Sequence, residues 1–264
     1  MSVGGGSTTG LGKAIALRTD LPHIVIPTTY AGSEATPILG QTENGVKTTL
    51  TDARVLPQVI LYDPELVTSL PVKMTVTSAL NAMAHAAEAL YATDRTAATD
   101  SLATDGLRAF ADGLPRVLQS PEDTGAREET LRGAWACGTV LGQVGMALHH
   151  KLCHTLGGAF DLPHADTHAV ILPHAISYNA EAAAEALRPI CEIFGGSAPG
   201  AALHRFAAGM NAPVALRDLG LREADLDHAA DLATRRPYPN PRSMTRSDIR
   251  ALLQAARAGG APDQ

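Results

Sequence analysis

The feature that most constrains the fold is a change in residue pattern near residue 71. Before it, short β-branched runs alternate with turn residues, as in Ile24–Ile26, Val46–Leu50 and Val59–Leu61. After it come long Ala- and Leu-rich amphipathic stretches, each bounded by Gly, Pro, Asp or Ser. The first pattern is typical of strands in an α/β fold, and the second predicts helices. We therefore expect an α/β domain over residues 1–71 and an all-α helical domain over residues 72–264.

The predicted helices cover most of the second domain. The pair Leu70-Pro71 marks its beginning, because the residue before a proline disfavours the helical conformation. The amphipathic stretches run approximately over residues 74–92, 97–118, 126–148, 180–194, 201–209, 222–234 and 245–258.

Composition excludes several classes of protein. The 264 residues are 45% hydrophobic and 18% charged, which is typical of a globular chain with a sizeable core. The net charge of -6, without long runs of like charge, indicates neither nucleic acid nor a membrane surface as partner. The N-terminus lacks the basic and apolar segments of a signal peptide. Three widely spaced cysteines favour free thiols, so we expect a cytoplasmic protein whose partners are small molecules and further copies of itself.

Two segments of small residues in the first domain are candidate nucleotide-binding loops. A glycine loop begins at Gly4, and a second loop follows directly on the strand that ends at Ile26. Glycine lets backbone N–H groups approach phosphate oxygens, and the ends of α/β strands are where such loops lie. Only three residues precede the glycine loop, too few for a supporting strand, so either that strand is missing or something else supports the loop. A plain flexible N-terminus is the alternative to a pyrophosphate site. The candidate residues are Gly4, Gly5, Gly6, Ser7, Thr28 and Thr29.

The histidines indicate where chemistry is to be sought, since six of the ten lie between residues 149 and 174. His150 and His154 are four residues apart on a predicted helix end, and a turn can bring His164 back to them. Asn81 and His85 share one face of an earlier helix. Buried imidazoles need partners for their ring nitrogens, so this set favours a ligand or metal site over a polar network inside a helical bundle.

These motifs, in this order, resemble the iron-containing alcohol dehydrogenase superfamily. Within this superfamily, the sequence from Gly145 to Gly158 resembles that of the maleylacetate reductases. Asn81 is a further point of resemblance, because most relatives carry Asp at this position. The motifs are Gly4-Gly5-Gly6-Ser7, Pro27-Thr28-Thr29 with Gly32-Ser33-Glu34, Asn81-x-x-x-His85-Ala86-x-Glu88, His150-x-x-x-His154-x-x-Gly157 and Pro163-His164.

The resemblance implies a homodimeric NAD(H)- or NADP(H)-dependent oxidoreductase that reduces maleylacetate, a small dicarboxylate, to 3-oxoadipate in the breakdown of aromatic compounds. It implies a nucleotide-binding domain, a helical substrate domain and an active site between them. It also implies that a first part of some eighty to ninety residues is lacking, and with it the residue that would select NAD or NADP.

The resemblance implies roles for individual residues. The catalytic set is Asn81, His85, His150, His154 and His164, while Lys151 and Arg242 are candidates for binding the substrate carboxylates. Family members bind iron or zinc, for which His85, His150 and His164 would be the ligands here. Asn81 cancels none of the charge of a divalent cation, so we expect a metal-free pocket. The alternatives are a metal-dependent alcohol dehydrogenase of the same superfamily and a shortened, non-redox binding or assembly protein.

Overall fold

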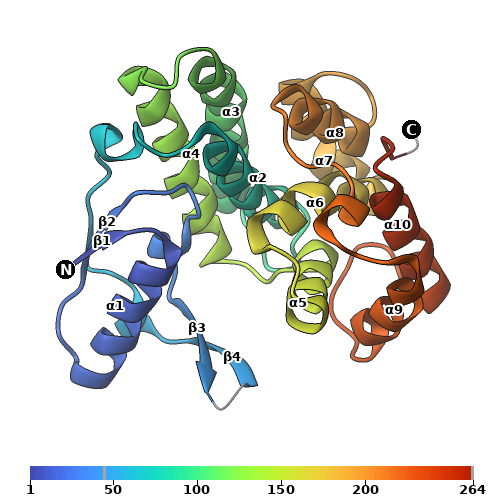
Figure 1. Cartoon of the computed structure of the whole chain (residues 1–264), viewed down its shortest axis with the longest axis horizontal. Coiled ribbons are helices and arrows are strands. Elements are labelled where there is room, and N and C mark those ends of the chain that lie inside the picture. Colours follow the sequence, from blue (N-terminus) through green and yellow to red (C-terminus); the bar gives the residue numbers. More distant parts are fainter. Residues whose placement is uncertain (44–45, 263–264) are drawn as a thin grey trace. The chain divides into compact units, whose positions relative to one another are not determined.

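The computed structural model describes residues 1–43 and 46–262, drawn in Figure 1. Their contacts divide the chain into two compact units. Unit 1 comprises Met1–Ala86 and Ser101–Gln143, and unit 2 comprises Ala87–Asp100 and Val144–Gln264. Within the described residues, no helix combines the length and the apolar character that crossing a membrane requires.

Unit 1 begins with strands and continues into helices. Its elements are β1 (Ser2–Gly4), α1 (Gly6–Thr19), β2 (Ile24–Pro27), β3 (Ile38–Glu43), β4 (Val46–Thr51) and β5 (Val59–Ile60), followed by α2 (Val72–Ala89), α3 (Ala97–Gln119) and α4 (Thr124–Leu141). The ends of α2 and α3 nearest residues 87–100 belong to unit 2. The predicted order of an α/β segment followed by helices is confirmed, since α2 begins at Val72.

The parallel sheet has the strand order β1-β2-β5, and α1 connects β1 to β2 (Figure 1). The expectation that too few residues precede the glycine loop to form a strand is wrong. Ser2, Val3 and Gly4 pair in register with Val25–Pro27, so three residues suffice beside a neighbour that supplies the hydrogen-bonding partners. Strands β3 and β4 form a separate antiparallel pair.

Two buried cations stabilise the loops of unit 1. The Nζ of Lys13 on α1 donates to the carbonyls of Ser33, Thr36 and Ile38 at 2.6–2.9 Å. Burial lowers the pKa of Lys13 to about 8, opposed by the charge of Glu34. Arg127 on α4, which is fully buried, donates to Tyr30, Thr75 and the carbonyls of Thr68, Leu70 and Pro121. Both cations fix short segments that connect the strands and helices of unit 1.

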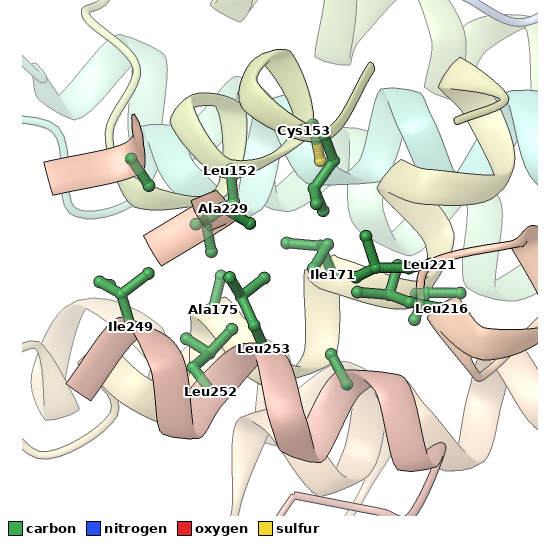
Figure 2. Packing of buried hydrophobic residues seen from close by; sticks show 14 of the residues in the cluster. Leu152, Cys153, Ile171, Ala175, Leu216, Leu221, Ala229, Ile249, Leu252 and Leu253 are labelled. Atoms are coloured by element: carbon green, nitrogen blue, oxygen red, sulfur yellow. The ribbon is translucent and has the colours of Figure 1, made fainter. Parts of the chain in front are cut away.

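Unit 2 is helical. It contains α5 (Leu148–Phe160), α6 (His164–Asn179), α7 (Ala184–Phe194), α8 (Pro199–Gly209), α9 (Leu226–Thr234) and α10 (Arg246–Ala258). Helix α6 packs against α5, α8 and α10. Figure 2 shows the core, where Ile171 and Ala175 of α6 lie among side chains from the surrounding helices, including Leu152 of α5 and Leu253 of α10.

Most predicted helices are confirmed to within a few residues, with two differences. The helix predicted over 126–148 is present as α4 but is shorter, because α4 ends at Leu141 and α5 begins at Leu148 after a segment containing Gly142 and Gly145. Helix α6 was not predicted. Its residues from Thr167 to Ile176 are all buried, so it lacks the polar stripe that identifies an amphipathic helix, and Pro173 lies inside it.

Candidate active site

The two candidate nucleotide-binding loops lie side by side in unit 1, at the carboxyl ends of β1 and β2. The backbone N–H of Thr28 donates to the carbonyl of Gly4 at 3.1 Å. A Cβ at Gly5 would come within 3.0 Å of the Thr29 side chain, so glycine permits this approach. Gly5 is also the N-cap of α1, and no side chain caps that end. The arrangement offers backbone donors and a helix dipole to an anion.

Glu88 organises the beginning of α5 in unit 2. Its carboxylate is fully buried and accepts from the backbone N–H groups of Ala147 (3.1 Å), His149 (2.7 Å) and His150 (3.4 Å). It also contacts the Nδ1 of the His150 ring at 2.6 Å. This contact, together with the hydrogen bond from the His150 backbone N–H, fixes the orientation of the ring relative to the start of α5. His150 lies in the first turn of α5 and His154 near its middle, whereas the sequence predicted both at the end of a helix.

Five imidazoles gather between α5 and α6. The ring of His168 lies 5.3 Å from that of His150 and 4.3 Å from that of His164, measured between centroids. The His154 ring lies 6.2 Å from that of His150. His154 and His164 are exposed, whereas His150 is 6% exposed. The structure thus brings together the three histidines that the sequence singled out in this region.

His149 and His168, with Cys153, form the buried side of this cluster. His149 Nε2 lies 3.0 Å from His168 Nδ1 and 3.6 Å from the Cys153 sulfur. These three ligand-type atoms all lie within 4.8 Å of one another. Burial, reinforced by the charge of Glu88, raises the pKa of the Cys153 thiol, which favours a neutral hydrogen-bonded chain. The His149-His150 pair and the spacing of Cys153 were the only sequence signal for this group.

The other predicted site residues lie elsewhere in the fold. Asn81 and His85 are both buried on α2, one turn apart. Lys151 lines a surface depression together with His154. The Arg242 guanidinium lies over the Tyr178 ring, 4.3 Å from its centroid. Tyr178 follows His164 by fourteen residues of α6, about 21 Å of helix, so Arg242 is not part of the imidazole cluster.

The donor chemistry fits a divalent cation poorly. The amide of Asn81 in unit 1 and the neutral imidazoles of unit 2 are donors that bring no negative charge. Glu88 is the carboxylate beside His150, but its oxygens already accept from three backbone N–H groups, the His150 ring and the Tyr91 hydroxyl. A buried cation would therefore gain little charge compensation from these residues.

Comparisons with known proteins identify the family of the chain. The chain matches the Fe-containing alcohol dehydrogenase family, C-terminal, over residues 75–257, and iron-containing alcohol dehydrogenase over residues 1–64. Maleylacetate reductase of Rhizobium sp. (strain MTP-10005) is 60% identical over 263 residues, which are 100% of this chain and 75% of that protein. Maleylacetate reductase of Pseudomonas knackmussii is 53% identical, over 99% of this chain and 74% of that protein.

Solved structures of the same family have the same fold. The crystal structure of maleylacetate reductase from Rhizobium sp. strain MTP-10005 superimposes with a TM-score of 0.97 over 99% of this chain and 74% of that one, at 60% identity. 1,3-Propanediol oxidoreductase, at 29% identity, superimposes with a TM-score of 0.89 over 96% of this chain and 75% of that one. The chain belongs to the maleylacetate reductase branch of the iron-containing alcohol dehydrogenase family.

Proposed function

We propose that this chain is an NAD(P)H-dependent oxidoreductase that reduces maleylacetate to 3-oxoadipate in the breakdown of aromatic compounds. Maleylacetate reductases of other bacteria match this chain along its whole length at 50–60% identity. The proposal rests mainly on the imidazole cluster, in which the His150 ring contacts the buried carboxylate of Glu88. Such a cluster can donate hydrogen bonds to the oxygen of an enolate and a proton to its α carbon.

The reaction has simple requirements. Maleylacetate carries two carboxylates and a ketone conjugated to a carbon–carbon double bond. When bound, the reduced nicotinamide would supply a hydride to the carbon β to the ketone, and the electron pair of the double bond would move toward the ketone oxygen. The resulting enolate takes a proton at the α carbon, giving the saturated oxo acid and the oxidised nicotinamide. The protein must stabilise the enolate oxygen and deliver one proton.

The residues divide between these two tasks. His150, with Nδ1 bonded to the Glu88 carboxylate, is suited to donate from its other nitrogen, because the carboxylate stabilises positive charge on the ring. His164 and His154, which are exposed, are suited to donate the proton and to recover it from solvent. Asn81 and His85 on α2 complete the set by hydrogen bonding to the substrate or orienting a histidine.

The cofactor would bind at the two loops of unit 1. The glycine loop and the neighbouring Thr28-Thr29 offer backbone donors to the pyrophosphate, at the carboxyl ends of parallel strands. We propose that catalysis needs no metal, since the donor set offers a cation little negative charge. A cytoplasmic location suits the three free cysteines, and the proposed homodimer is tested by light scattering.

The test is direct. The chain is incubated with maleylacetate and NADH or NADPH, and loss of the reduced nicotinamide is compared with formation of 3-oxoadipate. Equal amounts of each, unchanged by EDTA, are expected. Oxidation of simple alcohols that requires added iron or zinc, without reduction of maleylacetate, would instead identify a metal-dependent alcohol dehydrogenase.

A further inference from the structure

A depression on unit 2 beside His154 carries concentrated positive charge. Its volume is about 390 Å³, and its walls come from α5 and from the end of α9 with the two residues that follow. No Asp or Glu is among its lining residues. The lining side chains that can carry positive charge are Lys151, His154, Arg235 and Arg236.

The packing of α5 against α9 creates this depression. Helix α9 ends at Thr234, so Arg235 and Arg236 follow immediately and extend beside the outer face of α5. On α5, Lys151, His154 and Gly158 share one face because they are three and four residues apart. A Cβ at Gly158 would meet nothing within 4 Å, so the small residue leaves the depression open.

Within the part of the chain that the structure describes, Lys151, Arg235 and Arg236 of this depression lack a close carboxylate. Among the described residues, no ion pair within 4.0 Å involves Lys151, Arg235 or Arg236, although most arginines of unit 2 have one. The charge of Arg235 acts on Asp231, but that carboxylate is hydrogen-bonded by Arg246. Uncompensated like charges on one concave surface attract an anion, and arginine pairs well with a carboxylate.

We propose that this depression binds one carboxylate of the substrate, with Arg235 and Arg236 as its main ligands. The proposal rests on the proposed function and adds residues that the sequence motifs did not indicate. His154 belongs both to the depression and to the imidazole cluster, and its ring lies 6.2 Å from that of His150. In maleylacetate the ketone carbon is two bonds from one carboxylate carbon and three bonds from the other, about 2.5 to 4 Å. Because His154 lines the same depression as the two arginines, a carboxylate bound by the arginines keeps the ketone close to the imidazoles.

The test compares binding with turnover. Calorimetry measures the Kd of 3-oxoadipate, the unreactive dicarboxylate product, for the wild-type chain and for R235Q/R236Q. Loss of charge-assisted hydrogen bonds is expected to raise that Kd, and the KM for maleylacetate, by about ten- to a hundredfold. kcat should change little, because the arginines act on a group that does not react. R235K/R236K should recover part of the affinity, and R217Q, at an exposed arginine outside the depression, should behave as wild type.

A substrate analogue without the second carboxylate identifies the group that is bound. A monocarboxylate enone should be reduced equally slowly by the wild-type chain and by R235Q/R236Q. An unchanged Kd for 3-oxoadipate in R235Q/R236Q, with maleylacetate still reduced by wild type, would overturn this subsite alone. A wild-type chain that neither binds 3-oxoadipate nor reduces maleylacetate would overturn the proposed function and the subsite with it. Melting curves of each variant confirm that it is folded.

Discussion

At the scale of single residues, Glu88 shows how one buried carboxylate serves both structure and chemistry. It accepts hydrogen bonds from three backbone N–H groups at the start of α5. The first N–H groups of a helix have no partner within the helix, and Glu88 supplies one. The same carboxylate contacts the His150 ring. The His150 imidazole is thereby fixed to the helix that carries it, and the proposed electrostatic catalysis requires preorganisation of this kind.

The first prediction concerns the imidazoles. His150→Ala and His164→Ala in an active form should lower turnover of maleylacetate by about a hundredfold to a thousandfold, or about 3–4 kcal/mol, because each removes a preorganised donor. Steady-state kinetics measures the loss, and melting curves should stay within a few degrees of wild type. Lower stability with normal turnover would instead assign these histidines a purely structural role.

The second prediction concerns Asn81. Asn81→Asp adds one negative charge to a set that otherwise offers only neutral histidines, so binding of divalent cations should increase. Metal analysis of the protein after dialysis against zinc measures the difference from wild type, and Asn81→Ala serves as the uncharged control. Equal zinc content in all three proteins would mean that His85, His150 and His164 do not converge on one ion.

The third prediction concerns pH and His174. Burial, with a contribution from the charge of His204, lowers the pKa of His174 on α6 to about 4, whereas an unfolded histidine has a pKa near 6.5. The folded state therefore disfavours the protonated ring. Unfolding free energy should fall as the pH drops from about 6.5 to 4, with at most about 3 kcal/mol from this residue.

The measurement is urea unfolding at several pH values between 4 and 7. His174→Gln should show a shallower loss of stability over this range than wild type, because the replaced side chain does not titrate. His228→Gln changes an exposed histidine of α9 and should retain the wild-type pH dependence. Identical profiles for wild type and His174→Gln would show that folding does not lower the pKa of His174.

At the scale of secondary-structure elements, close backbone contact fixes α4 in unit 1. Gly138 on α4 lies against Gly32, which has a φ of +77° and precedes the short 3-10 helix Ser33–Ala35. A Cβ at Gly138 would stand 2.7 Å from the Gly32 Cα and closer still to its carbonyl oxygen. The helix can approach this loop only because both residues lack side chains.

The fourth prediction follows from that contact. Gly138→Ala should destabilise unit 1 by about 1–3 kcal/mol, since the added methyl group meets backbone that cannot rotate away. Gly10→Ala on α1 is the matched control. Its Cβ would meet nothing within 4 Å, so the greater helix propensity of alanine should stabilise the protein by up to about 1 kcal/mol. Chemical denaturation compares the two variants, and equal stabilities would contradict the packing of α4.

At the scale of the whole molecule, the first strand and helix of unit 1 carry an exposed apolar surface. Met1, Val3, Leu11, Ile15 and Leu21 are each about half exposed or more and line one depression on β1 and α1. Strand β1 pairs with β2 on one side only within the described sheet. The maleylacetate reductases in the comparison are longer, and this chain spans about three quarters of their length.

The fifth prediction concerns cofactor affinity. The glycine loop and Thr28-Thr29 can contact the pyrophosphate and the nicotinamide side, but no further group among the described residues of unit 1 is suited to hold the adenosine. The 264-residue chain should therefore bind NADH and NADPH with dissociation constants well above the low micromolar range, measured by nicotinamide fluorescence. The Rhizobium relative, measured in parallel, should bind more tightly. Low micromolar binding by this chain would show that the adenosine site lies within it.

The sequence by itself determined the order of the fold and the type of chemistry. Strand and helix periodicity is local, so β2 and most helices could be predicted from neighbouring residues. Motif spacing located His150, His154 and His164, which the structure brings into one cluster. Only the tertiary structure revealed the fully buried α6, the role of Glu88 and the placing of Arg235 and Arg236 beside His154. These depend on contacts between residues far apart in the chain, and neither burial on all sides nor a long-range hydrogen bond leaves a periodic pattern in sequence.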